Sequence, residues 1–413
     1  MAMDKLTIWA CQRKPQKKVL DSVEDPPHGE ISVSFRRDSY RKYATKLDEA
    51  RAPALSQASH TIGMLLTIIA TFVAISSAYA IMNFLTRTNH FNVANRTVVV
   101  TGGSQGLGLA VARQLAAKGA NIVIVAQTVS KLEEALNTIR SAAANPAIQK
   151  FTYLSFDLRS SDSAPAILAK VTEWNNGEPP DVVFNCAGNC IPSFFASSSV
   201  ETLRAQMDTL YWSCTYMAHA TLQHWLKPVG KGVQKSYDAK PRHLIFTSSV
   251  VAFMPIAGYA PYNPAKAAMR SLADTLNQEV QVYNGARKNP QPGPAAEIKI
   301  HAIYPTGILS PGFENEEKLK PALTKKLEED DQPQQPDELA GTIIAELEAG
   351  KYIITASLIG HIMKGWAMGG SQRVGIMDYL YTWLGSIIVL FIAPDFMSKC
   401  WKWGREKGLQ RAS

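Results

Sequence analysis

The chain has 413 residues, of which 46 % are apolar and 19 % charged, so a disordered protein is excluded and the low share of charge hints at membrane contact. The net charge of +8 is small for this length and no nucleic-acid-binding signature accompanies it, so no nucleic-acid partner is expected. Five cysteines exclude a disulfide scaffold and favour a reducing compartment, and no metal site is expected because Cys186 and Cys190 lack a second pair.

The N-terminal part of the chain divides into a polar tail and an apolar run. Residues 1–55 carry scattered prolines and mixed charge without a sustained apolar period, which predicts a disordered basic tail. Residues 61–85 read TIGMLLTIIATFVAISSAYAIMNFL and contain no charged residue. A bilayer crossing needs about 20 such residues, so we expect a transmembrane helix, with a buried core helix as the alternative.

Between residues 96 and 355 the sequence alternates between strand and helix patterns. Apolar periodicity predicts helices at Gly106–Lys118 and Lys131–Ala143, and polar loop insertions are expected at Lys227–Pro241 and Asn284–Glu297. This alternation predicts an α/β domain: a Rossmann-type, doubly wound parallel sheet with helices on both faces. Short β-branched runs mark the strands at Thr97–Val100, Ile122–Val125, Val182–Phe184, His243–Phe246, Ile298–Ile303 and Tyr352–Ile354.

A second apolar run closes the chain at Tyr379–Pro394, within a hydrophobic membrane segment predicted over residues 376–396. The run has about 16 residues, which is short for a straight crossing, so an interfacial or re-entrant helix and a full crossing both stay open. Trp383, Trp401 and Trp403 resemble interfacial anchors, and residues 397–413 form a basic tail.

A glycine-rich turn follows the first predicted strand. Residues 101–108 read TGGSQGLG and lead into the helix at Gly106–Lys118. Glycines let a backbone approach a pyrophosphate closely, and a helix N-terminus offers it free N–H groups. The position of this turn between strand and helix predicts a dinucleotide-binding loop.

Further motifs extend this pattern. The spacing T-G-x-x-x-G-x-G, Asp157-Leu158, Asn185-Cys186-Ala187-Gly188, Tyr262-x-x-x-Lys266 and Tyr304-Pro305-Thr306-Gly307 together resemble the short-chain dehydrogenase/reductase family over residues 96–355. Ser249 lies thirteen residues before Tyr262, at the family's spacing for its catalytic serine. The resemblance implies a cofactor site made of Gly102, Ser104, Gln105, Gly106, Gly108, Gln127, Lys131, Asp157, Leu158, Asn185, Ala187, Gly188, Tyr262, Lys266, Pro305, Gly307 and Ile308.

Ser249, Tyr262 and Lys266 suit the reduction of a ketone, which needs a hydride on carbon and a proton on oxygen. A tyrosine holds its proton at neutral pH, and a nearby ammonium stabilises the phenolate that remains after transfer. Tyr262 and Lys266 are four residues apart and share one helix face. Ser249 can donate a hydrogen bond to the substrate oxygen. We therefore predict these three residues as the catalytic group.

One position departs from the family pattern. The family completes its site with an asparagine, often within M-D-x-N, and this chain reads Met207-Asp208-Thr209-Leu210. That asparagine is thought to fix a helix kink and a water that links the lysine to solvent. Leu210 cannot hydrogen-bond through its side chain, so either another group substitutes or turnover is slow.

The end of the second predicted strand indicates the cofactor. An acid there would bind a ribose 2′-hydroxyl and repel a 2′-phosphate, but this chain has Ala126-Gln127-Thr128. Ser104, Gln127 and Lys131 can serve the phosphate instead. The sequence therefore favours NADPH over NADH.

The wider pattern is similar to one branch of this family, the fungal 3-ketodihydrosphingosine reductases of the endoplasmic reticulum. The resemblance is carried by residues 101–108, by Tyr211–Leu222 and by SPGFENE at residues 310–316. It implies a long-chain sphingoid ketone as substrate, with Glu314, Glu316 or Glu317 attracting its ammonium group. Other membrane reductases of steroid, retinoid or fatty acyl ketones, a soluble substrate, and a cofactor-binding scaffold without catalysis stay open.

The expected location is the endoplasmic reticulum membrane, with membrane lipids as partners. NADPH and free cysteines suit a cytosolic catalytic domain. Basic residues before the first apolar run argue the opposite: they would keep the N-terminal tail in the cytosol, and one membrane crossing would then place the domain in the lumen. We predict a cytosolic domain from the resemblance. Homo-oligomers are common in the family, but no residue here indicates one.

Overall fold

The computed structural model describes residues 88–227, 239–289 and 293–408, together with six positions of the first apolar run. The chain divides into two units, Met1–Thr86 and Arg87–Ser413, and each is described by itself. In the first unit, Gly63, Met64, Thr67, Ala70, Thr71 and Ala74 are helical. The predicted tail over residues 1–55 and the rest of the predicted span over residues 61–85 lie outside the described residues.

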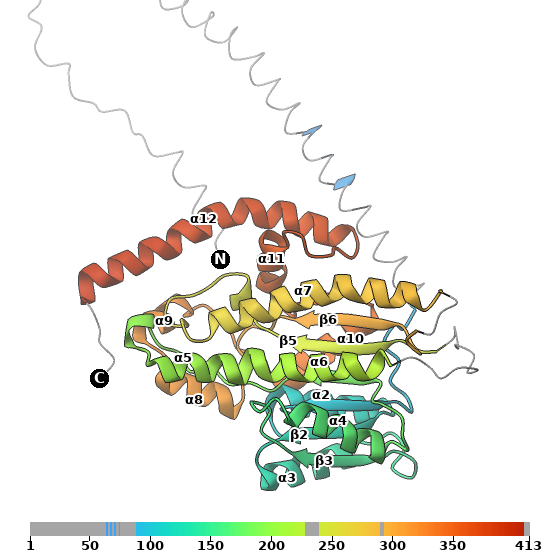
Figure 1. Cartoon of the computed structure of the whole chain (residues 1–413). Helices are drawn as coiled ribbons and strands as arrows, with labels where there is room; N and C mark the ends of the chain where they lie inside the picture. Colours follow the sequence, from blue (N-terminus) through green and yellow to red (C-terminus); the bar gives the residue numbers. More distant parts are fainter. Residues whose placement is uncertain are drawn as a thin grey trace, which may run out of the picture. The chain divides into compact units, whose positions relative to one another are not determined.

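The second unit is built on a parallel sheet whose strand order is β3-β2-β1-β4-β5-β6-β7 (Figure 1). The order reverses at β1, which pairs with β2 on one side and with β4 on the other. Ligands of doubly wound sheets bind at this switch point, beyond the carboxyl ends of the strands. The strands are β1 Thr97–Thr101, β2 Asn121–Ala126, β3 Phe151–Ser155, β4 Val182–Asn185, β5 Arg242–Thr247, β6 Ile298–Ile303 and β7 Ile353–Ile354.

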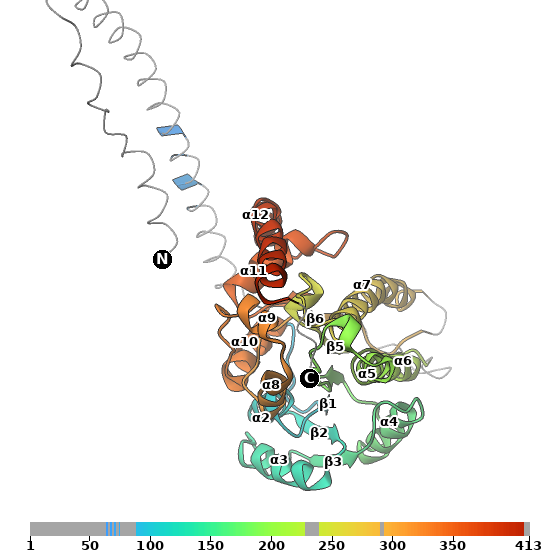
Figure 2. The ribbon, with the colours of Figure 1, turned by 90° about the vertical axis from the view of Figure 1, so that its left-hand side faces the viewer.

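Helices cover both faces of the sheet, as Figure 2 shows. One face is covered by α2 Gly106–Ala117, α3 Val129–Ser141 and α10 Pro336–Glu348, and the other by α4 Ser163–Trp174, α6 Ser213–Trp225 and α7 Asn263–Ala286. The predicted Rossmann-type architecture is confirmed for this unit. The remaining helices are α5 Val200–Met207, α8 Pro311–Leu319, α9 Ala322–Leu327, α11 Leu358–Ala367 and α12 Ile376–Lys407, with short turns at Phe195–Ser197, Asp208–Trp212 and Val250–Ala252.

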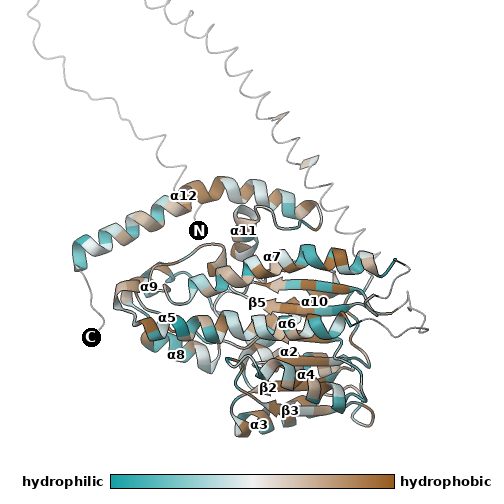
Figure 3. Cartoon of the chain, in the orientation of Figure 1, coloured by the Kyte–Doolittle hydropathy of each residue, from teal (hydrophilic) through white to brown (hydrophobic). Residues whose placement is uncertain are grey.

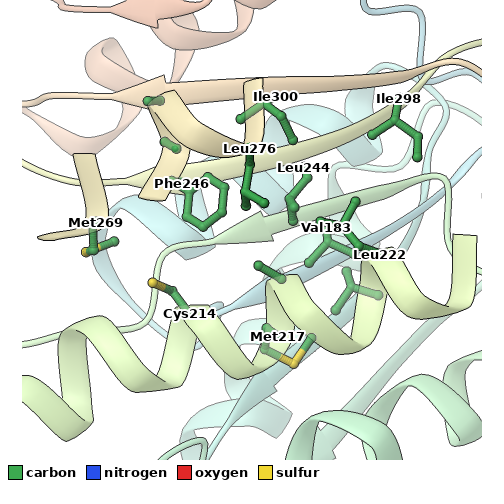
Figure 4. Close-up of a cluster of buried hydrophobic side chains, with 14 of the residues drawn as sticks. Val183, Cys214, Met217, Leu222, Leu244, Phe246, Met269, Leu276, Ile298 and Ile300 are labelled. Atoms are coloured by element: carbon green, nitrogen blue, oxygen red, sulfur yellow. The ribbon is translucent and has the colours of Figure 1, made fainter. Parts of the chain in front are cut away.

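The core explains why the strands read as nearly continuous apolar runs. Strands of a parallel sheet are buried on both faces, so each residue along them packs against a helix. Figure 4 shows one face, where Phe246 and its neighbours on the strands pack against Met217 of α6 and Leu276 of α7. All three side chains are at most 8 % exposed.

The structure adds two details to the predicted elements. Strand β3 was not among the predicted β-branched runs, and its residues FTYLS are only partly buried because the strand lies at the sheet edge. Helix α7 continues to Ala286, into the first residues of the predicted insertion Asn284–Glu297. Most of the other predicted insertion, Lys227–Pro241, lies outside the described residues.

The C-terminal part of the second unit forms a pair of packed helices, α11 and α12, which also contact the turn at Val250–Ala252 and α9. Helix α12 has 32 residues and continues without a break past Pro394. It therefore extends beyond residue 396, where the predicted hydrophobic segment ends, and into the predicted basic tail. Figure 3 shows its apolar central part. Within the described residues, α12 is the helix whose length and hydropathy are sufficient to cross a membrane.

Candidate active site

The glycine-rich turn connects β1 to α2 at the carboxyl edge of the sheet. A side chain at Gly108 would place its Cβ 2.3 Å from the carbonyl oxygen of Gly102, so only glycine lets the helix begin against the turn. Gly102 has a φ of +67° and lies against the backbone of Ala187. The first amides of α2 lack intrahelical acceptors and are free for a phosphate.

A cavity of about 260 Å³ opens beside this turn. Its lining includes nine of the predicted cofactor residues: Gly102, Ser104, Gln105, Gln127, Lys131, Asp157, Leu158, Ala187 and Gly188. Lys131 Nζ donates a hydrogen bond to Gln105 Oε1 at 3.1 Å. The residues present therefore fit a dinucleotide, with glycine backbone and helix amides on one side and a lysine at the rim.

Arg159, which is not among the predicted cofactor residues, also lines this cavity. Its guanidinium binds the carboxylate of Asp157 through two nitrogens, at 2.6 and 3.0 Å. These hydrogen bonds hold the pKa of Asp157 at about 2. Asp157 and Arg159 therefore form an ion pair in the lining of this cavity. In the sequence, the position of Arg159 directly after Asp157-Leu158 was the signal that could have indicated it.

A second cavity of about 520 Å³ contains the predicted catalytic residues Ser249, Tyr262 and Lys266. It shares Gly188 and Asn189 with the first cavity, so the two meet at the end of β4. Pro305, Gly307 and Ile308 line it, as predicted for the loop after β6. A volume in this range is typical of ligand pockets.

Ser249, Tyr262 and Lys266 are held by the chain that follows β5 and by the start of α7. Lys266 Nζ donates to the carbonyl of Thr247 at 2.9 Å and lies 5.5 Å from the centre of the Tyr262 ring. Ser249 Oγ lies 3.4 Å from the Pro305 carbonyl. Lys266 and Ser249 are both at most 8 % exposed. The structure thus brings together three residues that the sequence placed up to seventeen positions apart.

Burial dominates the electrostatics of this group. It raises the pKa of Tyr262 well above 10, with Cys190 and Glu316 adding to the rise and Ser249 opposing it through a hydrogen bond. Burial also lowers the pKa of Lys266 to about 8. The rise in the Tyr262 pKa outweighs the stabilisation of the phenolate that was expected from the Lys266 ammonium. The phenol therefore keeps its proton, as a proton donor must before transfer.

Three predicted cofactor residues lie outside these two cavities. Gly106 is the first residue of α2 and faces Ser310, which caps α8. Gly108 lies beneath the turn, and Asn185 is buried in β4, where its Nδ2 donates to the Ile245 carbonyl at 3.2 Å. Gly108 and Asn185 can therefore shape the site without lining it.

Leu210, at the position of the family's asparagine, lines the catalytic cavity. It is 1 % exposed, and its Cδ2 is so close to Gly188 that a Cβ there would lie 2.8 Å away. Residues Asp208–Trp212 form a π-helical turn between α5 and α6. The side chain at this point of the cavity is thus apolar.

A polar cluster that the sequence could not assemble lines the same cavity. The cluster consists of Tyr259 in the turn before α7, Glu316 of α8, and Lys320 and Glu328, which directly follow α8 and α9. Glu316 and Glu317, two of the acids predicted to attract an ammonium group, lie in the cavity lining, whereas Glu314 is exposed outside it.

Comparison with known proteins gives a family for this arrangement. The short chain dehydrogenase family matches residues 96–319. The chain is 54 % identical to 3-ketodihydrosphingosine reductase ksrA of Aspergillus fumigatus, over 78 % of this chain and 88 % of the relative. It is 41 % identical to 3-ketodihydrosphingosine reductase gsl-3 of Neurospora crassa, over 82 % and 91 %.

Two solved structures share the fold. A short chain dehydrogenase/reductase from Burkholderia phymatum in complex with NAD matches with a TM-score of 0.52 at 16 % identity, over 64 % of this chain and 90 % of its own. A putative short-chain alcohol dehydrogenase from Sinorhizobium meliloti matches with a TM-score of 0.50 at 19 % identity, over 64 % and 95 %.

Proposed function

This chain belongs to the short-chain dehydrogenase family, and we propose that it reduces the keto group of 3-ketosphinganine to sphinganine with NADPH. The observation that carries the proposal is the 54 % identity to a relative named 3-ketodihydrosphingosine reductase, across most of both chains. The chain is an oxidoreductase that uses a nicotinamide cofactor. The specific substrate and the choice of NADPH are the proposal.

The proposed roles follow from the catalytic cavity. When bound, the nicotinamide supplies the hydride to the substrate carbon. Tyr262 donates its proton to the substrate oxygen, and its raised pKa keeps it protonated until charge develops on that oxygen. Ser249 donates a hydrogen bond to the same oxygen. Lys266 supplies the ammonium that stabilises the phenolate left behind.

NADPH is proposed because the cofactor cavity combines basic side chains with a strand end that lacks an acid. Lys131 and Arg159 line this cavity, and β2 ends at Ala126 and is followed by Gln127 and Thr128. A 2′-phosphate is attracted by such cations, whereas an acid at this position would repel it. Ser104 adds a hydroxyl beside the phosphate site.

We further propose that α12 lies along a membrane surface rather than crossing it. Its N-terminal part packs on α11, and the helix also contacts α9. Farther along the helix, the hydrogen bond of Lys399 to Asp395 raises the pKa of Lys399, and the charges of Asp330 and Glu329, which follow α9, add to this effect. A helix that crosses a bilayer would carry its later residues away from the rest of the unit.

The outer face of α12 suits a lipid surface. Trp383, Leu390, Phe391 and Trp401 are each more than 60 % exposed, and basic residues follow toward the end of the helix. Aromatic side chains of this kind favour the headgroup region. We propose the cytosolic face of the endoplasmic reticulum. Protease treatment of sealed microsomes should cleave the catalytic domain, and full protection would refute this orientation.

The test of function is an assay of detergent-solubilised full-length protein with 3-ketosphinganine and either NADPH or NADH. We expect NADPH-dependent formation of sphinganine, which Tyr262→Phe abolishes. Tyr283→Phe, near the far end of the same helix, is the matched control and should retain full activity. Activity in Tyr262→Phe would refute the assigned proton donor.

Parallel assays separate the alternatives that Leu210 and the membrane segment raise. Turnover of a steroid ketone or of retinal in place of 3-ketosphinganine would assign another membrane reductase. Binding of NADPH without its oxidation by any of these carbonyl compounds would indicate a catalytically impaired scaffold.

A further inference from the structure

The catalytic cavity contains a second polar group, the Lys320 cluster, made of Lys320, Tyr259, Glu316, Glu317 and Glu328. Lys320 Nζ lies 2.8 Å from Glu328 Oε2 and 3.4 Å from Glu316 Oε1, and it also pairs with Glu317. The Tyr259 hydroxyl donates to Glu316 Oε1 at 2.5 Å and to Glu328 Oε2 at 3.0 Å. The proposed mechanism uses none of these residues.

The cluster already binds an alkylammonium group, that of its own lysine. The Lys320 side chain is 4 % exposed. Its Nζ lies 5.2 Å from the ring centre of Phe313 and 5.8 Å from that of Tyr259. Carboxylates combined with aromatic rings are the groups that hold organic ammonium ions in proteins. This lysine is therefore an internal example of the ligand class that the cluster accepts.

The charge of the cluster is not balanced by that lysine. Three carboxylates surround one ammonium, and the Glu316 and Glu328 side chains are only 17 % and 15 % exposed. Burial raises the pKa of Glu328, opposed by its bonds to Lys320. Negative charge in a poorly solvated cavity attracts a further cation more strongly than it would in water.

The cluster lies beside the proton donor. Tyr259 and Tyr262 are three residues apart in the turn that precedes α7, and their ring centres are 5.9 Å from each other. Both rings and Glu316 line the same 520 Å³ cavity. In a 2-amino-3-ketone, the ammonium is attached to the carbon next to the carbonyl. A carbonyl oxygen placed on Tyr262 therefore brings its neighbouring ammonium toward Tyr259 and Glu316.

We propose that Glu316, positioned by Tyr259 and assisted by Glu328, binds the ammonium group of an α-amino ketone and so selects such ketones over neutral ones. This inference rests on the proposed function and adds the residues that recognise the substrate's charged end. Lys320 occupies part of the same site, so it competes with the substrate for these carboxylates.

The test compares two ketones of equal chain length, 3-ketosphinganine and the same chain without the 2-amino group. In Glu316→Gln, we expect kcat/KM for the amino ketone to fall about ten- to hundredfold, the effect of losing one charge-assisted hydrogen bond. The value for the neutral ketone should stay within about twofold. Glu314→Gln, on the exposed face of the same helix, should change neither value.

A second variant is expected to bind the amino ketone more tightly, a result that a folding defect could not produce. Lys320→Met removes the competing cation, so KM for the amino ketone should decrease while the neutral ketone is unaffected. NADPH binding, followed by its fluorescence, should remain unchanged in all variants because the cofactor cavity excludes this cluster.

The results of these assays distinguish a failure of this inference from a failure of the proposed reductase function. Reduction of 3-ketosphinganine by the wild type, with equal losses for both ketones in Glu316→Gln, would show that the cluster only ties α8 to α9 and would overturn the inference alone. No reduction of 3-ketosphinganine by the wild type would overturn the proposed function and the inference together.

Discussion

The crossing of α11 and α12 should fail when a single methyl group is added at Gly365. A Cβ at this position would lie 1.9 Å from the carbonyl oxygen of Tyr381 and 2.4 Å from its carbon. Both are backbone atoms of α12, so no side-chain rotation can relieve the overlap. Ordinary contact begins at 3.4 Å, so the helices must separate by about 1.5 Å in Gly365→Ala.

This separation would also disturb a buried ion pair. Lys364 Nζ and Asp378 Oδ1 are 2.6 Å apart, with side chains 5 % and 8 % exposed. Overpacking of a buried contact costs about 1 to 3 kcal/mol, and loss of partnership in a buried pair adds to that cost. For a domain of this size the expected decrease in Tm is about 5 °C.

The assay is thermal unfolding in detergent together with limited proteolysis near residue 370. Gly365→Ala should unfold earlier and be cleaved faster between the two helices. The matched control is Gly404→Ala in α12, where nothing lies within 4 Å of the added Cβ. It should be as stable as wild type or slightly more stable, because alanine favours helix. An unchanged Tm and cleavage rate in Gly365→Ala would refute the packing described here.

Three further predictions concern turnover. Burial lowers the pKa of Lys266 to about 8, and the ammonium form of this lysine is the active one. The value of kcat/KM should therefore be constant at lower pH and fall about tenfold per pH unit above 8. A constant kcat/KM up to pH 9.5 would contradict a role for the Lys266 ammonium. Lys131→Met should raise KM for NADPH about tenfold and leave KM for NADH unchanged, and equal effects on both would exclude a 2′-phosphate contact. Leu210→Asn should raise the rate constant of reduction several-fold in single-turnover experiments. No increase would show that another proton relay already operates.

Much of the fold could be predicted because its signals are local. The glycine turn, the alternation of strands with helices and the pair Tyr262 and Lys266 are each written within a few consecutive residues. In a parallel sheet, every strand delivers the residues after it to one edge, so local motifs become a site without further information. Strand β3 gave a weaker signal because an edge strand is half-covered and needs no β-branched run.

The Lys320 cluster shows what local signals cannot provide. Glu314, Glu316 and Glu317 are equal candidates in the sequence because they are neighbours along the chain, and all three lie on α8. The structure separates them, since Tyr259 bonds to Glu316 across 57 positions and to Glu328 across 69. Such a pairing depends on how α8 and α9 fold over the end of the sheet, and no spacing along the chain encodes it.

Leu210 shows how the structure narrows a question that the sequence raises. The family's asparagine is associated with both a kink and a proton relay, but this chain keeps a π-helical turn at Asp208–Trp212 without it. Hydroxyl groups support the turn: Ser213 Oγ donates to the Thr209 carbonyl at 2.6 Å and Thr215 Oγ1 to the Tyr211 carbonyl at 2.7 Å. Both bonds run to the carbonyl four residues earlier and add to the hydrogen bonding of this segment. The backbone shape therefore does not need the asparagine, and the change at position 210 removes only a polar group from the cavity wall.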